Sequence, residues 1–166
     1  MRLLALQQPL AGDLRFITAA LKISNDLERV GDHAVNIAGS ALKLSELPQL
    51  KPLVDIPRMA DLALGMLAEA LDSFVRRDAA GARLLVRRDD EVDALNRQLF
   101  RELLTYMIED PATITRAMEL ILVARNLERV ADLATNVAEE VVFIAEARII
   151  KHHAEAQAAE DDFSRS

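Results

Sequence analysis

The chain has 166 residues, of which 51% are apolar and 4% aromatic, and it carries a net charge of −7 and no cysteine. This length suits one domain with a real core, and an apolar composition poor in aromatic residues, glycine and proline favours packed helices over a sheet. The negative charge argues against nucleic acid as a partner, and the lack of cysteine excludes disulfides, thiolate metal sites and a thiol nucleophile.

Prolines divide the first half of the chain. Residues 1–8 read as the last turns of a helix that ends at Pro9, and residues 10–44 as one long helix. Three prolines, Pro48, Pro52 and Pro57, then fall within ten residues, which predicts a linker over residues 48–57.

The second half reads as three helices. The first runs from 58 to about 77, and Asp78 is placed to cap a second over 79–107. Pro111 starts a third helix that reaches about residue 150, and the polar residues 151–166 are expected to be a disordered tail. The apolar positions of the first two helices are Met59, Leu62, Ala63, Met66, Leu67, Ala70, Leu71 and Phe74, then Leu85, Val92, Leu99 and Leu103.

One motif occurs twice, in residues 25–38 and again one hundred positions later in residues 125–138. Each copy carries a carboxylate, a second carboxylate and an amide four residues apart, which places the three on one face of a helix. The two sets are Glu28, Asp32 and Asn36, and Glu128, Asp132 and Asn136.

The glutamate of each set lies in the middle of an otherwise apolar line of residues spaced seven apart. The lines are Leu14, Leu21, Glu28, Val35 and Leu42, and Ile114, Ile121, Glu128, Thr135 and Val142. A parallel line in the second copy consists of alanines, which permits close helix packing. Carboxylates in such a seam require an arginine partner, protonation or a cation, and we favour the cation because Arg29 and Arg129 project about 100° away from them.

The chain resembles the PhoU family, helical regulators of bacterial phosphate uptake. The resemblance rests on residues 4–9, 13–15, 25–38, 115–117 and 126–132, and it covers most of the chain before residue 150. It implies an all-α fold of PhoU-like three-helix-bundle repeats, with about four long antiparallel helices. By this comparison residues 58–150 form a complete second repeat and residues 1–47 are the remnant of an N-terminally truncated first repeat. We expect the apolar faces left without partners to be covered in a homodimer.

In the PhoU family, acidic residues on the second and third helices of each repeat bind metal ions. The resemblance therefore assigns Asp89, Asp93, Glu128, Asp132 and Asn136 to a metal site, with Glu28, Asp32 and Asn36 as an incomplete one. Positions 93 and 128 lie at similar distances from the turn at Pro111, so the two acidic pairs are expected at the same height. Oxygen ligands suit iron, zinc, manganese or magnesium, and the alternative is that these are solvated acidic faces.

By resemblance the protein is a cytoplasmic, non-enzymatic regulator that reaches the membrane only through its partners. It would link a phosphate ABC transporter to a sensor histidine kinase and repress the response when phosphate is plentiful. One alternative is a carboxylate-bridged di-metal protein of the ferritin-like kind. That class uses Glu-x-x-His pairs, whereas Gly31 and Ala131 stand where the histidines would be. Another alternative is a metal-free packing module with ion-paired acids.

Overall fold

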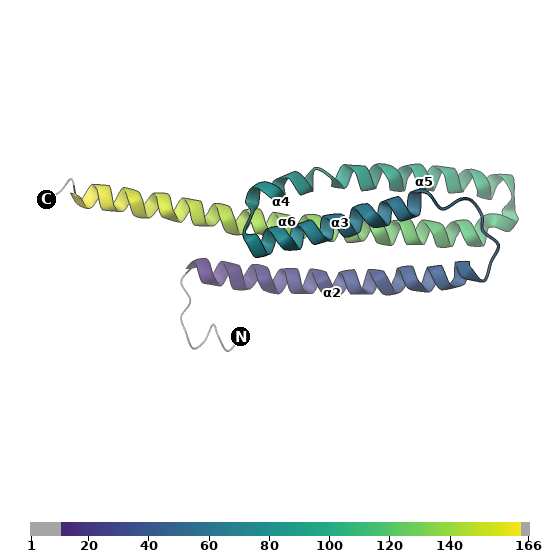
Figure 1. The fold of residues 1–166 in the computed structure, drawn as a ribbon, viewed down its shortest axis with the longest axis horizontal. Coiled ribbons are helices and arrows are strands. Elements are labelled where there is room, and N and C mark those ends of the chain that lie inside the picture. The colour runs from purple at the N-terminus through teal and green to yellow at the C-terminus, as the bar shows by residue number, and fades with distance from the viewer. Residues whose placement is uncertain (1–10, 164–166) are drawn as a thin grey trace.

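The computed structural model describes residues 11–163, with side chains from 13 to 146, and the predicted helical segment over 1–8 lies outside this range. Four long helices run alternately up and down (Figure 1), which confirms the predicted all-α architecture. The elements are α2 (Ala11–Ser45), α3 (Asp55–Arg76), α4 (Ala79–Val86), α5 (Asp89–Glu109), the 3₁₀ turn η1 (Pro111–Thr113) and α6 (Ile114–Phe163).

Helix α6 is the centre of the bundle, because α2, α3, α4 and α5 all pack against it. Four residues of its line of alanines are buried, as close helix packing requires: Ala117, Ala131 and Ala138 are 0% exposed and Ala124 is 1% exposed. Side chains this small let neighbouring helices approach closely on several sides at once.

The predicted seams of the second half form the core. Met59, Ala63, Met66 and Ala70 of α3 are completely buried, and the other predicted apolar positions of that helix are half-buried: Leu62, Leu67, Leu71 and Phe74. Leu85 of α4 is also buried, as are Val92, Leu99 and Leu103 of α5. The turns follow the sequence too: Asp78 accepts hydrogen bonds from the backbone N–H groups of Ala80 and Gly81, each at 3.0 Å, and so caps α4.

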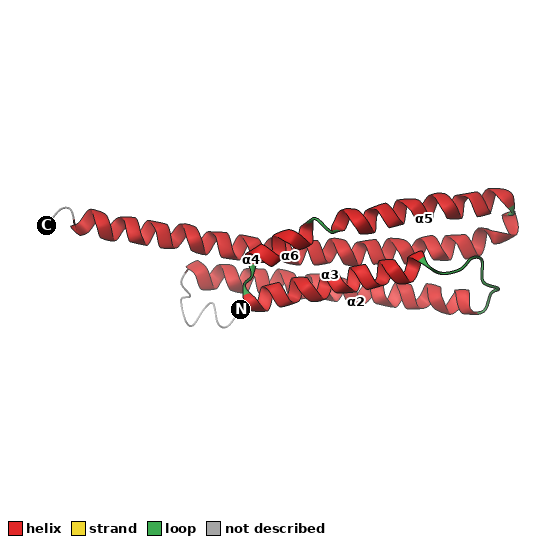
Figure 2. Ribbon diagram, turned by 45° about the horizontal axis from the view of Figure 1, so that its top comes forward, coloured by secondary structure: helices red, strands yellow, loops and turns green. Residues whose placement is uncertain are grey.

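Three predicted boundaries are wrong. The helix expected over 79–107 breaks at Arg87 and Arg88, between α4 and α5 (Figure 2). Both residues keep right-handed backbone angles, and Arg88 is held by Glu69 of α3 at 2.6 Å, so a tertiary ion pair accompanies the break.

Helix α3 starts at Asp55, since Pro57 fits the first turn, where its missing N–H has no partner to lose. Residues 151–163 continue α6 instead of forming a disordered tail, in keeping with their alanine and glutamate content.

The linker before α3 is fastened to the bundle by Lys51, whose side chain is 6% exposed. Its ammonium group binds the carboxylate of Asp55 at 3.2 Å and that of Glu102 on α5. Burial acts to lower the pKa of Lys51, but hydrogen bonds and charges from Glu102 and Asp55 outweigh it and raise the pKa. The linker is therefore an ordered, ion-paired segment.

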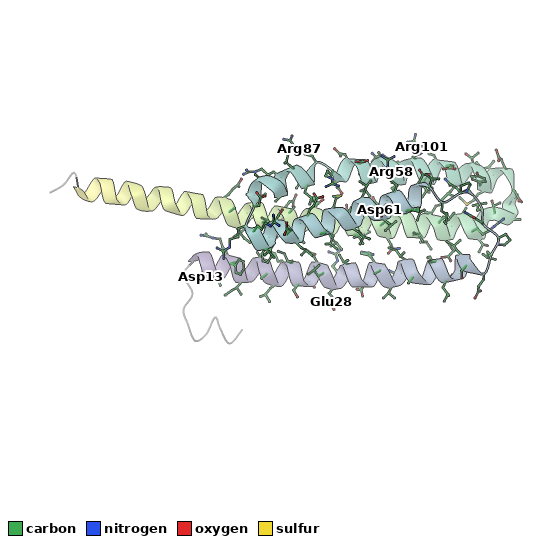
Figure 3. The ribbon with its side chains drawn as sticks, viewed as in Figure 1. Asp13, Glu28, Arg58, Asp61, Arg87 and Arg101 are labelled. Atoms are coloured by element: carbon green, nitrogen blue, oxygen red, sulfur yellow. The ribbon has the colours of Figure 1, made fainter. Side chains whose placement is uncertain are left out.

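Helix α2 packs on α6 along one side and leaves its other side exposed. Ion pairs join Lys22 to Glu140 at 2.6 Å and Lys43 to Glu119 at 2.8 Å. The seven-spaced line through Glu28, predicted to be a buried seam, faces outward, and Figure 3 shows Glu28 pointing away from the other helices. Within the described residues, no helix is both long enough and apolar enough to cross a bilayer.

Candidate functional site

The four acids predicted for the second repeat lie within electrostatic reach of one another on α5 and α6. Asp89 and Asp93 lie in the first two turns of α5, while Glu128 and Asp132 lie one turn apart on α6, and all four are half-buried. Burial first, then the charges of Asp132 and Asp93, and more weakly those of Asp90 and Glu128, raise the pKa of Asp89. The two helices thus bring the predicted carboxylates within electrostatic reach of one another.

The pKa of Glu128 is also raised, although the charges of two arginines act against the shift. Burial raises its pKa, as do the charges of Asp132 and Asp93, while Arg129 and Arg125 act to lower it, and the net shift is upward. Arg129 forms no ion pair with Glu128 among the described side chains, in keeping with the predicted divergence of these two neighbours. It lies close enough to offset part of the negative charge.

Polar neighbours already hold two of the acids. The side-chain amide of Asn96 donates to Oε2 of Glu128 at 3.0 Å, and Arg97 pairs with Asp93 at 3.3 Å. Among the residues whose side chains are described, no three His, Asp or Glu groups converge as metal ligands. The donor types suit a hard cation, but the side chains as they lie are arranged around Asn96 and Arg97, and ligation requires them to exchange these partners.

Asn136 joins the acidic face at its far end. It is exposed, and with Asp89, Asp132 and Arg129 it lines an open groove of about 290 Å³. Its predicted place, one turn beyond Asp132, thus puts its amide beside two of the four acids.

The first-repeat set is not joined by a second acidic pair within the described residues. Glu28 and Asp32 are exposed on the outer side of α2. Asn36 turns instead toward α6, where its amide donates to Oδ1 of Asn126 at 3.3 Å, and His33 Nδ1 lies 2.8 Å from the same oxygen. On these contacts Asn36 is part of a polar bridge between α2 and α6.

Two asparagines of this region were missed in the sequence. Asn96 lies three residues after Asp93 and so shares its helix face, and Asn126 stands inside the repeated motif two residues before Glu128. A search restricted to carboxylates passes over both, although a buried carboxylate needs hydrogen-bond donors near it. Their contacts depend on how the helices pack, which the spacing does not show.

Replacing Glu128 by glutamine is expected to stabilise the chelator-treated protein near neutral pH. Because the pKa of Glu128 is raised in the folded state, the folded protein binds more protons than the unfolded chain in the range above the ordinary value of 4.5. Stability contributed by this group therefore falls as the pH rises through that range. Urea midpoints measured in EDTA from pH 4.5 to 8 should decline less steeply in the variant, and an unchanged slope would contradict the assignment.

The sequence of this chain is similar to those of known proteins over most of its length. The sequence profile described as "PhoU domain" matches residues 1–41 and 56–141. A protein of Aquifex aeolicus named "Phosphate-specific transport system accessory protein PhoU homolog" is 49% identical over 151 residues, which is 91% of this chain and 68% of that protein. A Caulobacter vibrioides protein of the same name is also 49% identical, over 86% of this chain and 62% of its own length. The chain thus spans about two thirds of the length of these relatives.

Solved structures of PhoU proteins are also similar to this chain. The crystal structure of PhoU from Pseudomonas aeruginosa superposes with a TM-score of 0.84 at 39% identity, covering 88% of this chain and 70% of that one. The phosphate transport system regulatory protein PhoU from Streptococcus pneumoniae gives a TM-score of 0.76 at 31% identity, over 86% and 67% of the two chains.

Proposed function

Because this chain belongs to the PhoU domain family, we propose that it is a non-enzymatic regulator of phosphate transport. The observation that carries the proposal is the 49% identity, over 91% of the chain, to a relative named as an accessory protein of a phosphate-specific transport system. The elongated bundle supports such a role, because it offers long helical faces for docking other proteins (Figure 1).

In its finer form, the proposal is that the protein acts in the cytoplasm and links a phosphate ABC transporter to a sensor histidine kinase. It would repress the response when phosphate is plentiful. Faces outside the exposed side of α2 are available for two partners: apolar side chains are exposed on α3, such as Val75 at 78%, and on α5, such as Ile108 at 74%.

The experiment is complementation of a bacterium that lacks its own PhoU gene. Expression of this chain should restore repression of a transporter-gene reporter at high phosphate, and an empty vector should not. Full derepression, with the protein present at wild-type level by immunoblot, would overturn the regulatory role.

We also propose that Asp89, Asp93, Glu128 and Asp132, with Asn136 beside them, hold a divalent or trivalent metal ion. The raised pKa values of Asp89 and Glu128 support this, since they reflect carboxylates that are partly buried and that also repel one another, and a cation would relieve both effects. Iron, zinc, manganese and magnesium all accept such oxygen ligands.

Elemental analysis after incubation with each metal and dialysis tests this site. Metal should remain with the parent chain and be lost in Glu128→Gln/Asp132→Asn. The matched control, Glu28→Gln/Asp32→Asn, changes the equivalent exposed positions of α2 and should retain it. If the parent also releases all metal, the acids are structural and the chain is a metal-free packing module.

The exposed face of α2 leads us to propose a homodimer. Its apolar residues are placed symmetrically about Glu28, with Leu21 and Val35 seven positions away and Leu14 and Leu42 fourteen away. All four are between 45% and 71% exposed. A two-fold interface requires a self-complementary patch, and antiparallel pairing of two α2 helices would set each leucine or valine opposite an apolar partner.

Sedimentation of the intact chain tests this arrangement. The parent should be dimeric at micromolar concentration, and Leu21→Glu/Val35→Glu should be monomeric with an unchanged helical spectrum. Leu64→Glu alters an equally exposed leucine of α3, 60% exposed, and should leave the dimer intact. A parent that sediments as a monomer at every concentration would rule the interface out.

A further inference from the structure

A groove beside the acidic face has the opposite charge. It lies between α5 and α6, has a volume of about 440 Å³, and is lined by four arginines: Arg97, Arg101, Arg125 and Arg129. Glu128 is the one carboxylate in its lining, in a protein whose net charge is −7. Four guanidinium groups around one small volume repel each other, and the single carboxylate of Glu128 offsets only part of their charge.

The fold makes little use of these arginines. The pair of Arg97 with Asp93 joins residues one helical turn apart, with the arginine side chain 60% exposed, so it contributes little to stability. Arg101 uses only its Nε, which donates to the backbone carbonyl of Arg97 at 3.2 Å. In the described part of the chain, no ion pair engages Arg101, Arg125 or Arg129.

The residues that line the groove and its size indicate which kind of anion it binds. Guanidinium groups match phosphate oxygens in geometry and are the usual protein ligands for them. The groove is within the size range of small-molecule sites and is larger than one phosphate ion requires. Phe100, 50% exposed, and the half-buried Ile121 add an apolar wall on which a planar ring can rest.

We propose that this groove binds a small molecule that carries several phosphate groups, with the guanidinium groups of Arg125 and Arg129 as its main ligands. Glu128 faces the same groove, where Asn96 binds it, and its charge opposes the anion. This inference goes beyond the regulatory role and is tested without reference to it.

Calorimetric titration at low salt, with tripolyphosphate and with ATP as probes, tests the proposal on the full-length chain. The parent should bind at least one of the two. Arg125→Gln/Arg129→Gln should weaken binding about tenfold or more, as expected for the loss of charged hydrogen bonds. Glu128→Gln should tighten it, because a negative charge is removed from the groove.

A matched control and one further variant complete the design. Arg76→Gln/Arg83→Gln removes two exposed arginines of α3 and α4 that pair with Asp72 and Glu146, and it should leave binding unchanged. Phe100→Ala separates the two sources of the anion. A loss of ATP affinity with an unchanged tripolyphosphate affinity identifies a nucleotide, and affinities for both probes equal to those of the parent identify an inorganic polyphosphate. Absence of binding to both probes, or undiminished binding by the Arg125/Arg129 variant with its helical spectrum intact, would overturn the proposal.

Discussion

Replacement of Leu99 by alanine is expected to lower the free energy of unfolding by about 2–5 kcal/mol, the range typical of buried leucines. Leu99 lies in the middle of α5, is 1% exposed, and belongs to the core that α3, α5 and α6 share. Truncation leaves a cavity that the surrounding helices refill only in part. Urea unfolding followed by circular dichroism at 222 nm measures the loss.

The control for this prediction is Leu104→Ala, which removes the same atoms from the same helix at a position that is 42% exposed. It should cost clearly less than Leu99→Ala, since more than a third of the side chain already lies in water and its removal leaves no enclosed cavity. Similar losses in the two variants would mean that α5 does not pack on α6 through the face described.

Lys51→Met is expected to destabilise the protein by about 2 kcal/mol, because Asp55 and Glu102 lose the cation between them. The cost falls below that of a fully buried pair, since the Glu102 side chain is 37% exposed and keeps water. The raised pKa of Lys51 sets the pH dependence. The contribution is complete below the ordinary lysine value of 10.5 and is lost as the pH rises through the folded-state value.

Thermal unfolding at pH 7 measures this effect, and Arg76→Met is the comparison. Arg76 forms an exposed pair with Asp72 within one helix, which contributes close to nothing. The double variant Lys51→Met/Glu102→Gln should regain part of the loss, because the neutral amide no longer needs a cation. Equal stability of Lys51→Met and the parent would show that the linker is not held by this ion pair.

The helices of the second half could be predicted because the sequence pattern that specifies each of them lies within a short stretch of the chain. Leu85, Val92, Leu99 and Leu103 recur at helical spacing, and their burial follows from the need of any such apolar face for a partner. The cap at Asp78 likewise depends on residues only a few positions away.

The outward direction of Glu28 could not be predicted in this way. Periodicity shows that α2 has an apolar line, but whether another element covers that line depends on the rest of the chain. The line through Glu128 has the same spacing and is half-buried from Ile121 onward, where other helices lie beside it, while the line through Glu28 has no such neighbour in the described residues. The break in the helix at Arg87 could not be predicted either, since no glycine or proline accompanies it.

In the candidate site, the sequence predicts which carboxylates approach each other but not what neutralises them. The spacing of Asp89, Asp93, Glu128 and Asp132 determines their common face. The positions of Asn96 and Arg97 depend on rotamers and on packing across two helices, which a linear pattern does not contain.

The attachment of α2 to α6 has a consequence for how the chain folds. Its ion pairs join residues 118 positions apart in one case and 76 in the other. Closing such long loops costs more entropy than pairing neighbouring helices, so α3 to α6 should assemble first and α2 should be added last. Among the α2 residues whose side chains are described, only Ala19, Ile23 and Ser40 are buried, so this helix should also be the first to detach in native-state hydrogen exchange, while the other helices remain folded.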